Sequence, residues 1–381
     1  MDFEAVSRIS IPADTLTLAD VAISLTSGSR GAACVALGSW PHSKATKSGT
    51  RQEPRRQSQI HYSWRVLEVP EVVANRARSV GADQWLEQLP ETVARLSRAW
   101  GLVANGQAYD GGTEAFVMPV IADGFGPAVL KMIVPRDSGP ASDAAGHEIV
   151  VLRTAGGTGC AALYRSDQDL GALLLEQLGP SLFDLGLALE ERHRIQCRTA
   201  ARMWRPVDNN IGLPTGARKA NWLIDYINTT WNDLDRPCTK RAVEHALSCA
   251  RRRIEAHHPR TATLVHGDVN DWNVLRTLDG ADYKLIDPDG LVADPEYDLG
   301  VIMREDPLDL MAEADPMDRA RRLAVWAQQH STVAIDPVKI WEWGVVERVS
   351  TGLMAIEIDL QPIGSEMLEA ADQLSFDWTG D

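Results

Sequence analysis

Two short stretches of the sequence carry oxygen-bearing side chains at a spacing that suits chemistry on a phosphate group. The first contains Asp268 and, five residues later, Asn273; the second contains Asp287 at the end of an apolar run. Residues 274–286 between them have the pattern of a strand, an Asp-Gly turn and a second strand. Because a hairpin brings its two ends together, we expect Asn273 and Asp287 to be neighbours, with Asp268 one short loop away.

These side chains predict a particular reaction. The amide oxygen of Asn273 and the carboxylate of Asp287 are hard ligands of the kind that Mg²⁺ bound to a nucleoside triphosphate prefers. Asp268 can orient a hydroxyl group of an acceptor and take its proton. A single aspartate in a loop carries little information, because aspartate is common in turns. The ordered set, however, favours phosphoryl transfer over an ordinary polar hairpin.

The same residues resemble the catalytic loop and metal-binding aspartate of the aminoglycoside phosphotransferase family. The motifs that carry the resemblance are His266-Gly-Asp268, Asn273 and Ile286-Asp287. Residues 287–306 look like one branch of the family, the streptomycin 6-kinases and hydroxyurea phosphotransferases, and the resemblance extends over residues 66–374. It implies an α+β, protein kinase-like fold, with a small antiparallel-sheet N-terminal lobe and a helix-rich C-terminal lobe. It also implies ATP and Mg²⁺ as cofactors, and a role for Asp298 in bracing the loop of Asp268.

A lysine and a glutamate are expected to serve the phosphates. Lys131 is the only charged residue within the apolar strand predicted over residues 128–134, where an ammonium group is costly unless it reaches a partner. The resemblance implies that Lys131 binds the α- and β-phosphates and pairs with Glu148, in a helix predicted over residues 144–153. The alternatives are an edge lysine whose ammonium group reaches water and a solvent-facing glutamate.

Two backbone segments are further candidates for nucleotide contacts. The first, a glycine-rich turn before a strand, can close over triphosphate oxygens with its N–H groups, although such a pair of glycines also forms ordinary hairpin turns. The second is implied by the resemblance: a hinge between the lobes whose backbone binds the adenine edge. The turn comprises Gly111, Gly112 and Thr113, and the hinge comprises Glu176, Gln177 and Leu178.

The acceptor is expected to bind in the C-terminal lobe. Asn270 and Trp272 are the better candidates, because both lie within the catalytic loop. Trp341 and Glu347 lie on a long helix predicted after Pro337. In enzymes of this family, aromatic and acidic side chains of C-terminal helices bind polyhydroxylated cations. Either of these two residues by itself fits a core or solvent-facing position more readily than a pocket.

Composition limits the class of protein. The 381 residues include 38 basic and 53 acidic side chains, a net charge of −15. This charge argues against nucleic-acid binding and would attract a cationic acceptor, although many soluble proteins are equally acidic. The five scattered cysteines form neither a zinc pattern nor a disulfide framework, and no apolar run approaches the ~20 residues that span a bilayer. We expect a cytoplasmic enzyme without a membrane partner, as a monomer or weak dimer.

The chain is expected to divide into three segments. Residues 1–64 contain a basic, polar stretch without periodicity and should be a disordered extension. Residues 65–178 should form the N-terminal lobe, and residues 179–376 the catalytic and acceptor-binding C-terminal lobe. Helices are predicted over residues 71–79 and 90–100. Pro90 should lie in the first turn of the second helix, whose apolar stripe should pack into the core.

The predicted function is ATP-dependent transfer of the γ-phosphate to a hydroxyl group of a small molecule, with an aminocyclitol antibiotic of the streptomycin type as acceptor. One alternative is a kinase of the same fold that acts on hydroxyurea or a small metabolite. Another is a nucleotide-binding pseudokinase without catalytic activity. The presence of Lys131, Asp268, Asn273 and Asp287 together argues against the pseudokinase.

Overall fold

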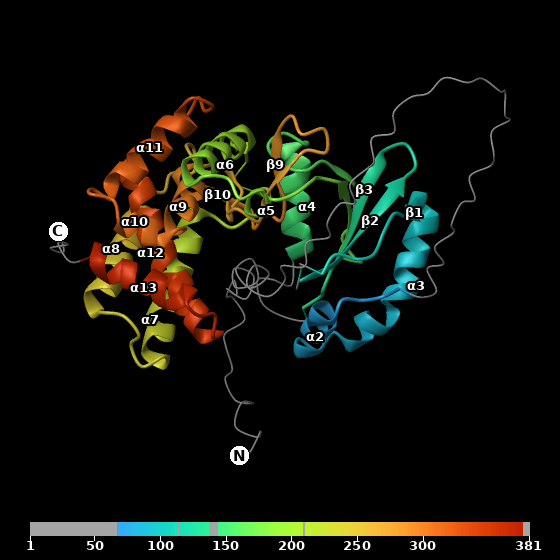
Figure 1. Cartoon of the computed structure of the whole chain (residues 1–381), viewed down its shortest axis with the longest axis horizontal. Coiled ribbons are helices and arrows are strands. Elements are labelled where there is room, and N and C mark those ends of the chain that lie inside the picture. The colour runs from blue at the N-terminus through green and yellow to red at the C-terminus, as the bar shows by residue number, and fades with distance from the viewer. Residues whose placement is uncertain (1–66, 111, 113, 137–143, 209, 376–381) are drawn as a thin grey trace, which may run out of the picture.

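The computed structural model describes residues 67–110, 112, 114–136, 144–208 and 210–375 (Figure 1). The extension predicted for residues 1–64 lies outside the described residues. In Figure 1 the first helices and strands gather at one end of the molecule and α6 (Leu189–Met203) to α13 (Ile363–Leu374) at the other, with α4 (Ala144–Ala155) between them.

The N-terminal end contains a five-stranded antiparallel sheet with the order β1-β2-β3-β5-β4. Its strands are β1 (Leu102–Ala104), β2 (Ala115–Ala122), β3 (Gly126–Ile133), β4 (Leu163–Asp167) and β5 (Ala172–Glu176). In β3, Lys131 pairs with Val117 of β2 and Leu173 of β5. The lysine therefore lies in a central strand, which excludes the alternative of a lysine on an edge strand.

Two helices cover one face of this sheet, α2 (Glu71–Ser79) and α3 (Asp83–Trp100). The predicted stripe of α3 is buried as expected, with Leu89 and Val93 packed in the same cluster as Phe116 of β2. The predicted start of this helix was wrong, because α3 begins seven residues before Pro90 and contains the proline in its interior. A proline there lacks the N–H that would bind the carbonyl of Leu86, and burial of the apolar stripe offsets this loss.

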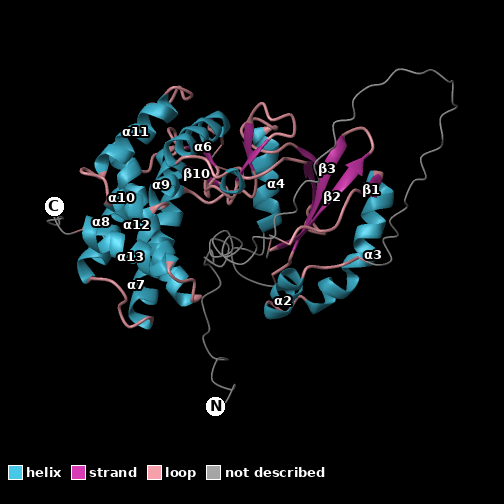
Figure 2. Ribbon diagram, viewed as in Figure 1, coloured by secondary structure: helices cyan, strands magenta, loops and turns pink. Residues whose placement is uncertain are grey.

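The rest of the chain is mainly helical (Figure 2). Its further helices are α5 (Leu182–Leu185), α7 (Gly216–Asp233), α8 (Lys240–Ala256), α9 (Glu296–Arg304), α10 (Pro307–Met311), α11 (Met317–Gln328) and α12 (Pro337–Glu357). Its strands form a small sheet of β10 (Leu291–Ala293), β7 (Thr263–Val265) and β6 (Arg205–Pro206), and a hairpin of β8 (Val274–Arg276) and β9 (Tyr283–Leu285). Within the described residues, every helix is too short or too polar to cross a membrane.

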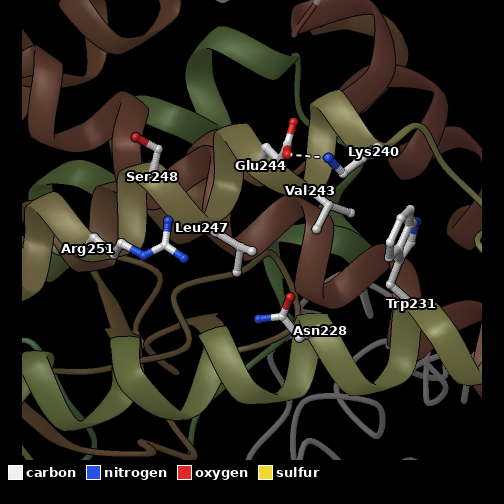
Figure 3. Close-up of a pocket in the computed structure, with 8 residues that line it drawn as sticks. All are labelled: Asn228, Trp231, Lys240, Val243, Glu244, Leu247, Ser248 and Arg251. Atoms are coloured by element: carbon white, nitrogen blue, oxygen red, sulfur yellow. Dashed lines mark ion pairs between the residues drawn. The ribbon is translucent and has the colours of Figure 1, made fainter. Parts of the chain in front are cut away.

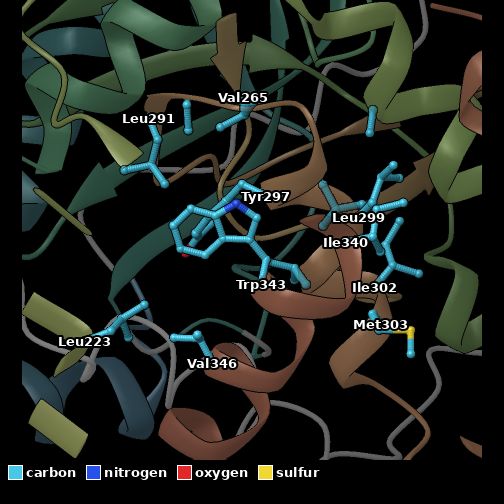
Figure 4. Packing of buried hydrophobic residues seen from close by; sticks show 14 of the residues in the cluster. Leu223, Val265, Leu291, Tyr297, Leu299, Ile302, Met303, Ile340, Trp343 and Val346 are labelled. Carbon is cyan, nitrogen blue, oxygen red and sulfur yellow. The ribbon is translucent and has the colours of Figure 1, made fainter. Parts of the chain in front are cut away.

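The crossing of α9 and α12 forms the centre of the larger core (Figure 4). A Cβ atom on Gly300 of α9 would lie 2.3 Å from Cβ of Trp343 on α12, so the two backbones approach closely at this point. The ring of Trp343 meets that of Tyr297 edge-on, with 4.8 Å between their centroids. This packing fixes α9, which carries two residues that bind the predicted catalytic loop, Asp298 and Arg304.

The helix α4 links the two ends of the molecule. Its buried residues Ile149 and Leu152 belong to the same apolar cluster as the C-terminal helices. Leu130 and Met132 of β3 belong instead to the cluster beneath α2 and α3. Because side chains alternate along a strand, Lys131 faces away from that second cluster and towards α4.

Candidate active site

The predicted catalytic loop, residues 266–273, connects β7 to β8. Asp298 of α9 fixes the beginning of this loop through hydrogen bonds. One carboxylate oxygen of Asp298 accepts the backbone N–H of His266 (3.0 Å) and the indole N–H of Trp204 (2.7 Å). The other accepts the backbone N–H of Gly267 (2.8 Å). Burial raises the pKa of Asp298, against the opposing effects of the His266 charge and these donors. The prediction that Asp298 braces this loop is confirmed.

Gly267 is required by the backbone of the loop. Its φ angle is +92°, in a region that favours glycine. A Cβ atom at this position would also lie 2.9 Å from Cβ of Asp289. The conformation of Gly267 turns the chain so that Asp268, the predicted base, follows directly after the two backbone N–H groups that Asp298 binds.

The carboxylate of Asp268 is buried, with a residue exposure of 5%, and has donors on both oxygens. Oδ1 accepts a bond from Nη2 of Arg304 (3.0 Å). Oδ2 accepts bonds from the side-chain amides of Asn270 (2.9 Å) and Asn273 (2.8 Å). The guanidinium group of Arg304 offsets part of the buried negative charge, and the two amides fix the orientation of the carboxylate.

The predicted hairpin is confirmed, and it brings Asn273 and Asp287 to the same place. β8 and β9 pair antiparallel, and the N–H of Ile286 donates to the carbonyl of Asn273 (2.9 Å). Asp287 follows with a φ angle of +54°, a conformation that aspartate adopts more readily than most residues. Its side chain is 52% exposed, in contrast to its neighbours.

Lys131 joins the sheet to this hairpin. Its Nζ lies 2.7 Å from Oε2 of Glu148 and 2.8 Å from Oδ1 of Asp287. Burial by itself lowers the pKa of Lys131, but the charges of Asp287 and Glu148 outweigh it, so the pKa is raised and the ammonium form is kept. Burial raises the pKa of Glu148, and the charge of Lys131 opposes that shift. Residues that are distant in sequence thus meet at one ammonium group.

The predicted hinge begins at Glu176, the last residue of β5. The carboxylate of Glu176 accepts bonds from the N–H of Ala162 (3.0 Å) and from Nζ of Lys284 (2.6 Å). The amide of Gln177 donates to the hydroxyl group of Tyr109 (3.2 Å). Within the described part of the chain, the backbone N–H and C=O of Leu178 have no hydrogen-bond partner. Of the predicted glycine turn, Gly112 is half-buried before β2, whereas Gly111 and Thr113 lie outside the described residues.

The four residues predicted to bind the acceptor lie in different surroundings. Trp272 stacks on Phe183 of α5, with 3.6 Å between the ring centroids. Asn270 is buried, and its Oδ1 accepts the N–H groups of Trp272 and Asn273. Trp341 is directed towards His245 of α8. Glu347 is 1% exposed and reaches the loop through Arg304, which binds both Glu347 and Asp268.

A pocket of about 550 Å³ opens beside the catalytic loop. Trp272 and Asp271 of the loop line it, together with Phe183. Asp271 is paired with Arg192, which also binds Asp306 at 2.9 Å. Its charged lining also includes Asp309 of α10, Glu366 of α13, and Glu305, which is paired with Arg304.

A second pocket, of about 400 Å³, lies between α7 and α8 (Figure 3). Trp231 and Asn228 of α7 face Lys240, Leu247 and other residues of α8 across it. Its lining contains none of the predicted site residues. Of these two pockets, the acidic one is lined by residues of the predicted catalytic loop.

A model of the aminoglycoside/hydroxyurea antibiotic resistance kinases matches residues 99–357. The chain belongs to this family. It is 26% identical over 309 residues to the streptomycin 6-kinase of Streptomyces glaucescens, covering 72% of this chain and 96% of that protein. It is 31% identical over 242 residues to the hydroxyurea phosphotransferase of Kitasatospora aureofaciens, covering 61% of this chain and 67% of that protein. The prediction of a phosphotransferase is thereby confirmed.

Solved structures show the fold of the kinase. The macrolide 2'-phosphotransferase of Brachybacterium faecium superposes with a TM-score of 0.51 at 15% identity, covering 75% of this chain and 98% of that one. An aminoglycoside phosphotransferase in a ternary complex with ADP and hygromycin B has the same TM-score at 16% identity, covering 75% and 99%. The predicted kinase-like α+β fold is confirmed.

The side-chain oxygens of Asn273 and Asp287 are of the kind that binds a magnesium ion together with a nucleotide. Asn273 uses its amide N–H groups on Asp268, and Asp287 uses Oδ1 on Lys131, so one oxygen of each side chain remains for another ligand. Among the described residues, there is no cluster of three or more acidic, histidine or cysteine side chains that could hold a metal. Two protein oxygens, completed by phosphate oxygens and water, are what Mg²⁺ commonly uses.

Arg304, which binds Asp268 from α9, was not among the residues predicted from the sequence. A signal was present: Tyr297 and Arg304 are seven residues apart in an otherwise mostly apolar helix, so they lie on the same side, two turns apart. Both contact Glu347 of α12. The spacing predicts that they share a partner but does not identify it.

Proposed function

We propose that this kinase transfers the γ-phosphate of ATP to a hydroxyl group of a small cationic molecule, with an aminocyclitol of the streptomycin type as the first candidate. The observation that carries the proposal is the convergence at the hairpin. Lys131 reaches Asp287 from the sheet, and Asn273, at the other end of the same hairpin, binds Asp268. A phosphate donor, a metal and an acceptor can meet only where such groups converge.

Each residue of this set has a proposed role. Lys131 binds phosphate oxygens, and Glu148 orients its ammonium group. Asn273 and Asp287 would hold Mg²⁺, which when bound neutralises charge on the phosphates. Asp268 orients the acceptor hydroxyl group and takes its proton. Because the transition state of phosphoryl transfer is loose, positioning and charge neutralisation should contribute more than the proton transfer.

The nucleotide is proposed to bind between the sheet and the hairpin. The unpaired backbone of Leu178 supports the predicted adenine contact at the hinge. Contacts of Gly111, Gly112 and Thr113 with the triphosphate remain predictions. ATP as donor is also the reason to place the enzyme in the cytoplasm.

The acceptor is proposed to occupy the acidic pocket beside the loop. Asp309 and Glu366 are at least partly exposed there, and no ion pair of theirs occurs among the described residues. The stacked rings of Trp272 and Phe183 offer a flat surface to a sugar or a guanidinium group. Trp272 is thus retained as a proposed acceptor contact, and the contact predicted for Asn270 remains a prediction. Trp341 and Glu347 do not line this pocket.

Hydroxyurea is the second candidate acceptor. The observation that favours it is the 31% identity to a hydroxyurea phosphotransferase over 242 residues, which exceeds the identity to the streptomycin kinase of Streptomyces glaucescens. A pocket of about 550 Å³ with several carboxylates is, however, large and strongly charged for a small neutral molecule. The pocket therefore favours a larger cation.

An acceptor screen tests the proposal. Purified protein is incubated with ATP and Mg²⁺, and ADP release is measured with streptomycin, other aminocyclitols, a neutral sugar and hydroxyurea. The expected result is acceptor-dependent release that is fastest with an aminocyclitol and absent without Mg²⁺. Release with hydroxyurea alone would favour the second candidate, and release with none of these acceptors would contradict both.

A further inference from the structure

A buried chain of polar side chains leads from α12 to the predicted base. The hydroxyl group of Tyr297 donates to Oε1 of Glu347 (2.5 Å), and Nη1 of Arg304 lies 3.3 Å from the other oxygen of Glu347. Nη2 of Arg304 then donates to Oδ1 of Asp268 (3.0 Å). Four residues from three parts of the sequence form one path, which we call the Tyr297–Asp268 relay.

The guanidinium group at the centre of the relay has little freedom to rotate. Its third edge, Nε, donates to Oε1 of Glu305 (2.8 Å). Three carboxylates, those of Asp268, Glu305 and Glu347, therefore hold three different nitrogens of one planar group. Because a guanidinium group presents its donors in a rigid fork, fixing two of its edges determines the direction of the third.

Burial makes these contacts strong. Tyr297, Arg304 and Glu347 are 0%, 1% and 1% exposed, so water cannot replace a missing partner within the relay. Burial by itself lowers the pKa of Arg304, but the charges of Glu305, Asp268 and Glu347 raise it well above its ordinary value. Burial and the charge of Glu347 raise the pKa of Tyr297, so its hydroxyl group keeps the proton that it donates.

We propose that Glu347 and Tyr297 are positioning residues for the phosphoryl transfer: they hold Arg304, which sets the rotation of the Asp268 carboxylate. This inference rests on the proposed function of Asp268. It gives Glu347 a role within the protein in place of the predicted contact with the acceptor. With Arg304 on Oδ1 and the two asparagines on Oδ2, a small rotation of the guanidinium group would move the carboxylate away from the acceptor hydroxyl group.

Removing the charge of Glu347 should shift the guanidinium group of Arg304 without leaving a cavity at position 347. In Glu347→Gln the side chain keeps its size, but Arg304 loses one of three carboxylates and is drawn towards the remaining two. Tyr297→Phe removes one hydrogen bond to Glu347 and leaves the ring in place. The matched control is Tyr226→Phe, because Tyr226 also donates to a glutamate of α12, Glu357 (2.9 Å), at the C-terminal end of the helix.

The test is a comparison of steady-state constants for the three variants. Glu347→Gln should lower kcat by about ten- to a hundredfold, and Tyr297→Phe by a smaller factor, while KM for ATP and for the acceptor changes less than about twofold. Tyr226→Phe should leave kcat unchanged. A rise in acceptor KM with unchanged kcat in Glu347→Gln would overturn the proposal in favour of direct acceptor binding.

A double variant separates positioning from a general loss of structure. If Glu347 acts through Asp268, then adding Glu347→Gln to Asp268→Asn should leave the residual rate unchanged within about twofold. An independent, multiplicative loss in the double variant would contradict the relay. Absence of turnover in the wild-type protein would instead contradict the proposed function.

A crystal structure of Glu347→Gln gives a result that does not depend on turnover. The relay predicts that Arg304 and the carboxylate of Asp268 are both rotated, with the bond from Asn273 to Asp268 weakened or lost. An unchanged Asp268 in that structure would overturn the proposal. If Glu347→Gln fails to fold, Tyr297→Phe provides the same comparison with a smaller change.

Discussion

Lys131 is held between a carboxylate of the helix α4 and a carboxylate of the hairpin that follows the catalytic loop. An ammonium group within a central strand would be strongly destabilising without such partners. Its two bonds explain why the charge is kept and also why it points towards the proposed phosphate site. Because the side chain of Asp287 is half exposed, its carboxylate can bind another cation, such as the proposed metal ion, in place of Lys131.

Asp287→Asn should therefore remove metal-dependent nucleotide binding while leaving the fold intact. Lys131 keeps Glu148 as its partner in this variant, so the sheet should not be disturbed. In the wild-type protein, ATP at 100 times its Kd should stabilise the fold by about 2.7 kcal/mol when Mg²⁺ is present. The increase in Tm that results from this stabilisation should disappear in Asp287→Asn. It should persist in the control variant Asp279→Asn, which changes the exposed turn of the same hairpin. An equal thermal shift in both variants would exclude Asp287 as a metal ligand.

Part of the geometry of the candidate site could be predicted from local sequence patterns. Lys131 is a charge in an apolar strand, and Asp268, Asn273 and Asp287 have spacings set by one loop and one hairpin. Contacts between distant segments could not be predicted in this way. The partnership of Glu347 with Arg304 depends on the angle at which α9 and α12 cross, and no local pattern contains that angle.

At the scale of elements, the close approach of α9 and α12 determines the position of the catalytic loop. α9 carries Asp298 at its beginning and Arg304 at its end, and both contact that loop. Gly300 lies between them, at the point where α9 meets Trp343. A methyl group added at Gly300 would therefore displace α9, and the displacement would reach the loop through both Asp298 and Arg304.

Gly300→Ala is expected to destabilise the protein and to reduce its activity. The added methyl group would overlap Trp343, and overpacking of this kind typically costs about 1–3 kcal/mol. Thermal unfolding should show a lower Tm, and kcat should fall because α9 carries Asp298 and Arg304. Val325→Ile adds the same group at an exposed position of α11 and is the control. Unchanged stability in Gly300→Ala would show that the helices can separate freely.

The packing of α8, α12 and α13 contains a histidine that should make stability depend on pH. His245 of α8 lies against Trp341 of α12 and within 3.0 Å of the hydroxyl group of Ser375, which follows α13. Burial, together with the charges of Arg252 and Arg348, lowers the pKa of His245 to about 4. The folded protein therefore keeps this imidazole neutral well below the ordinary pKa of histidine.

The sign of the effect follows from proton binding. Between pH ~6.5 and ~4 the unfolded chain protonates this histidine and the folded chain does not, so acid favours unfolding. The free energy of unfolding should fall across this range by on the order of 3 kcal/mol from this residue. His245→Gln should flatten that part of the pH profile in chemical denaturation, whereas His330→Gln, at an exposed site, should not. A slope that persists in His245→Gln would contradict the assignment.

The element boundaries show where sequence patterns were sufficient. The helix at residues 71–79 and the hairpin of β8 and β9 have the predicted positions, because periodicity and a turn signal mark their ends. The start predicted for the second helix, Pro90, was wrong, because α3 begins at Asp83 and continues through the proline. Tertiary burial decided that case, and it is not visible in a local window.

At the scale of the whole molecule, the site forms where the sheet meets the helical end of the chain. The sheet provides Lys131, the catalytic loop and hairpin provide Asp268 and Asp287, and α10 and α13 provide acids of the neighbouring pocket. The net charge of −15 predicts an overall negative potential around the protein. Such a potential should attract a cationic acceptor, and salt should weaken the attraction.

The salt dependence of turnover should therefore differ between acceptors. From about 0.01 M to about 0.15 M ionic strength the screening length falls from roughly 30 Å to roughly 8 Å. Over this range kcat/KM for an aminocyclitol cation should fall by on the order of tenfold. With hydroxyurea, which is neutral, it should change much less, and KM for ATP measured in parallel controls for effects on the nucleotide. Equal salt dependence for both acceptors would contradict electrostatic recognition in the acidic pocket.

The most direct test of the account is to follow the phosphoryl group itself in the wild-type protein and in Asp268→Asn. Each protein is incubated with γ-labelled ATP, Mg²⁺ and streptomycin, and the label in the acceptor is measured over time. We expect labelled acceptor with the wild type, and a rate lower by about 10²–10⁴ in the variant, with ATP binding retained. Equal transfer rates in the two proteins would contradict the central claim that the acceptor hydroxyl group reacts at Asp268.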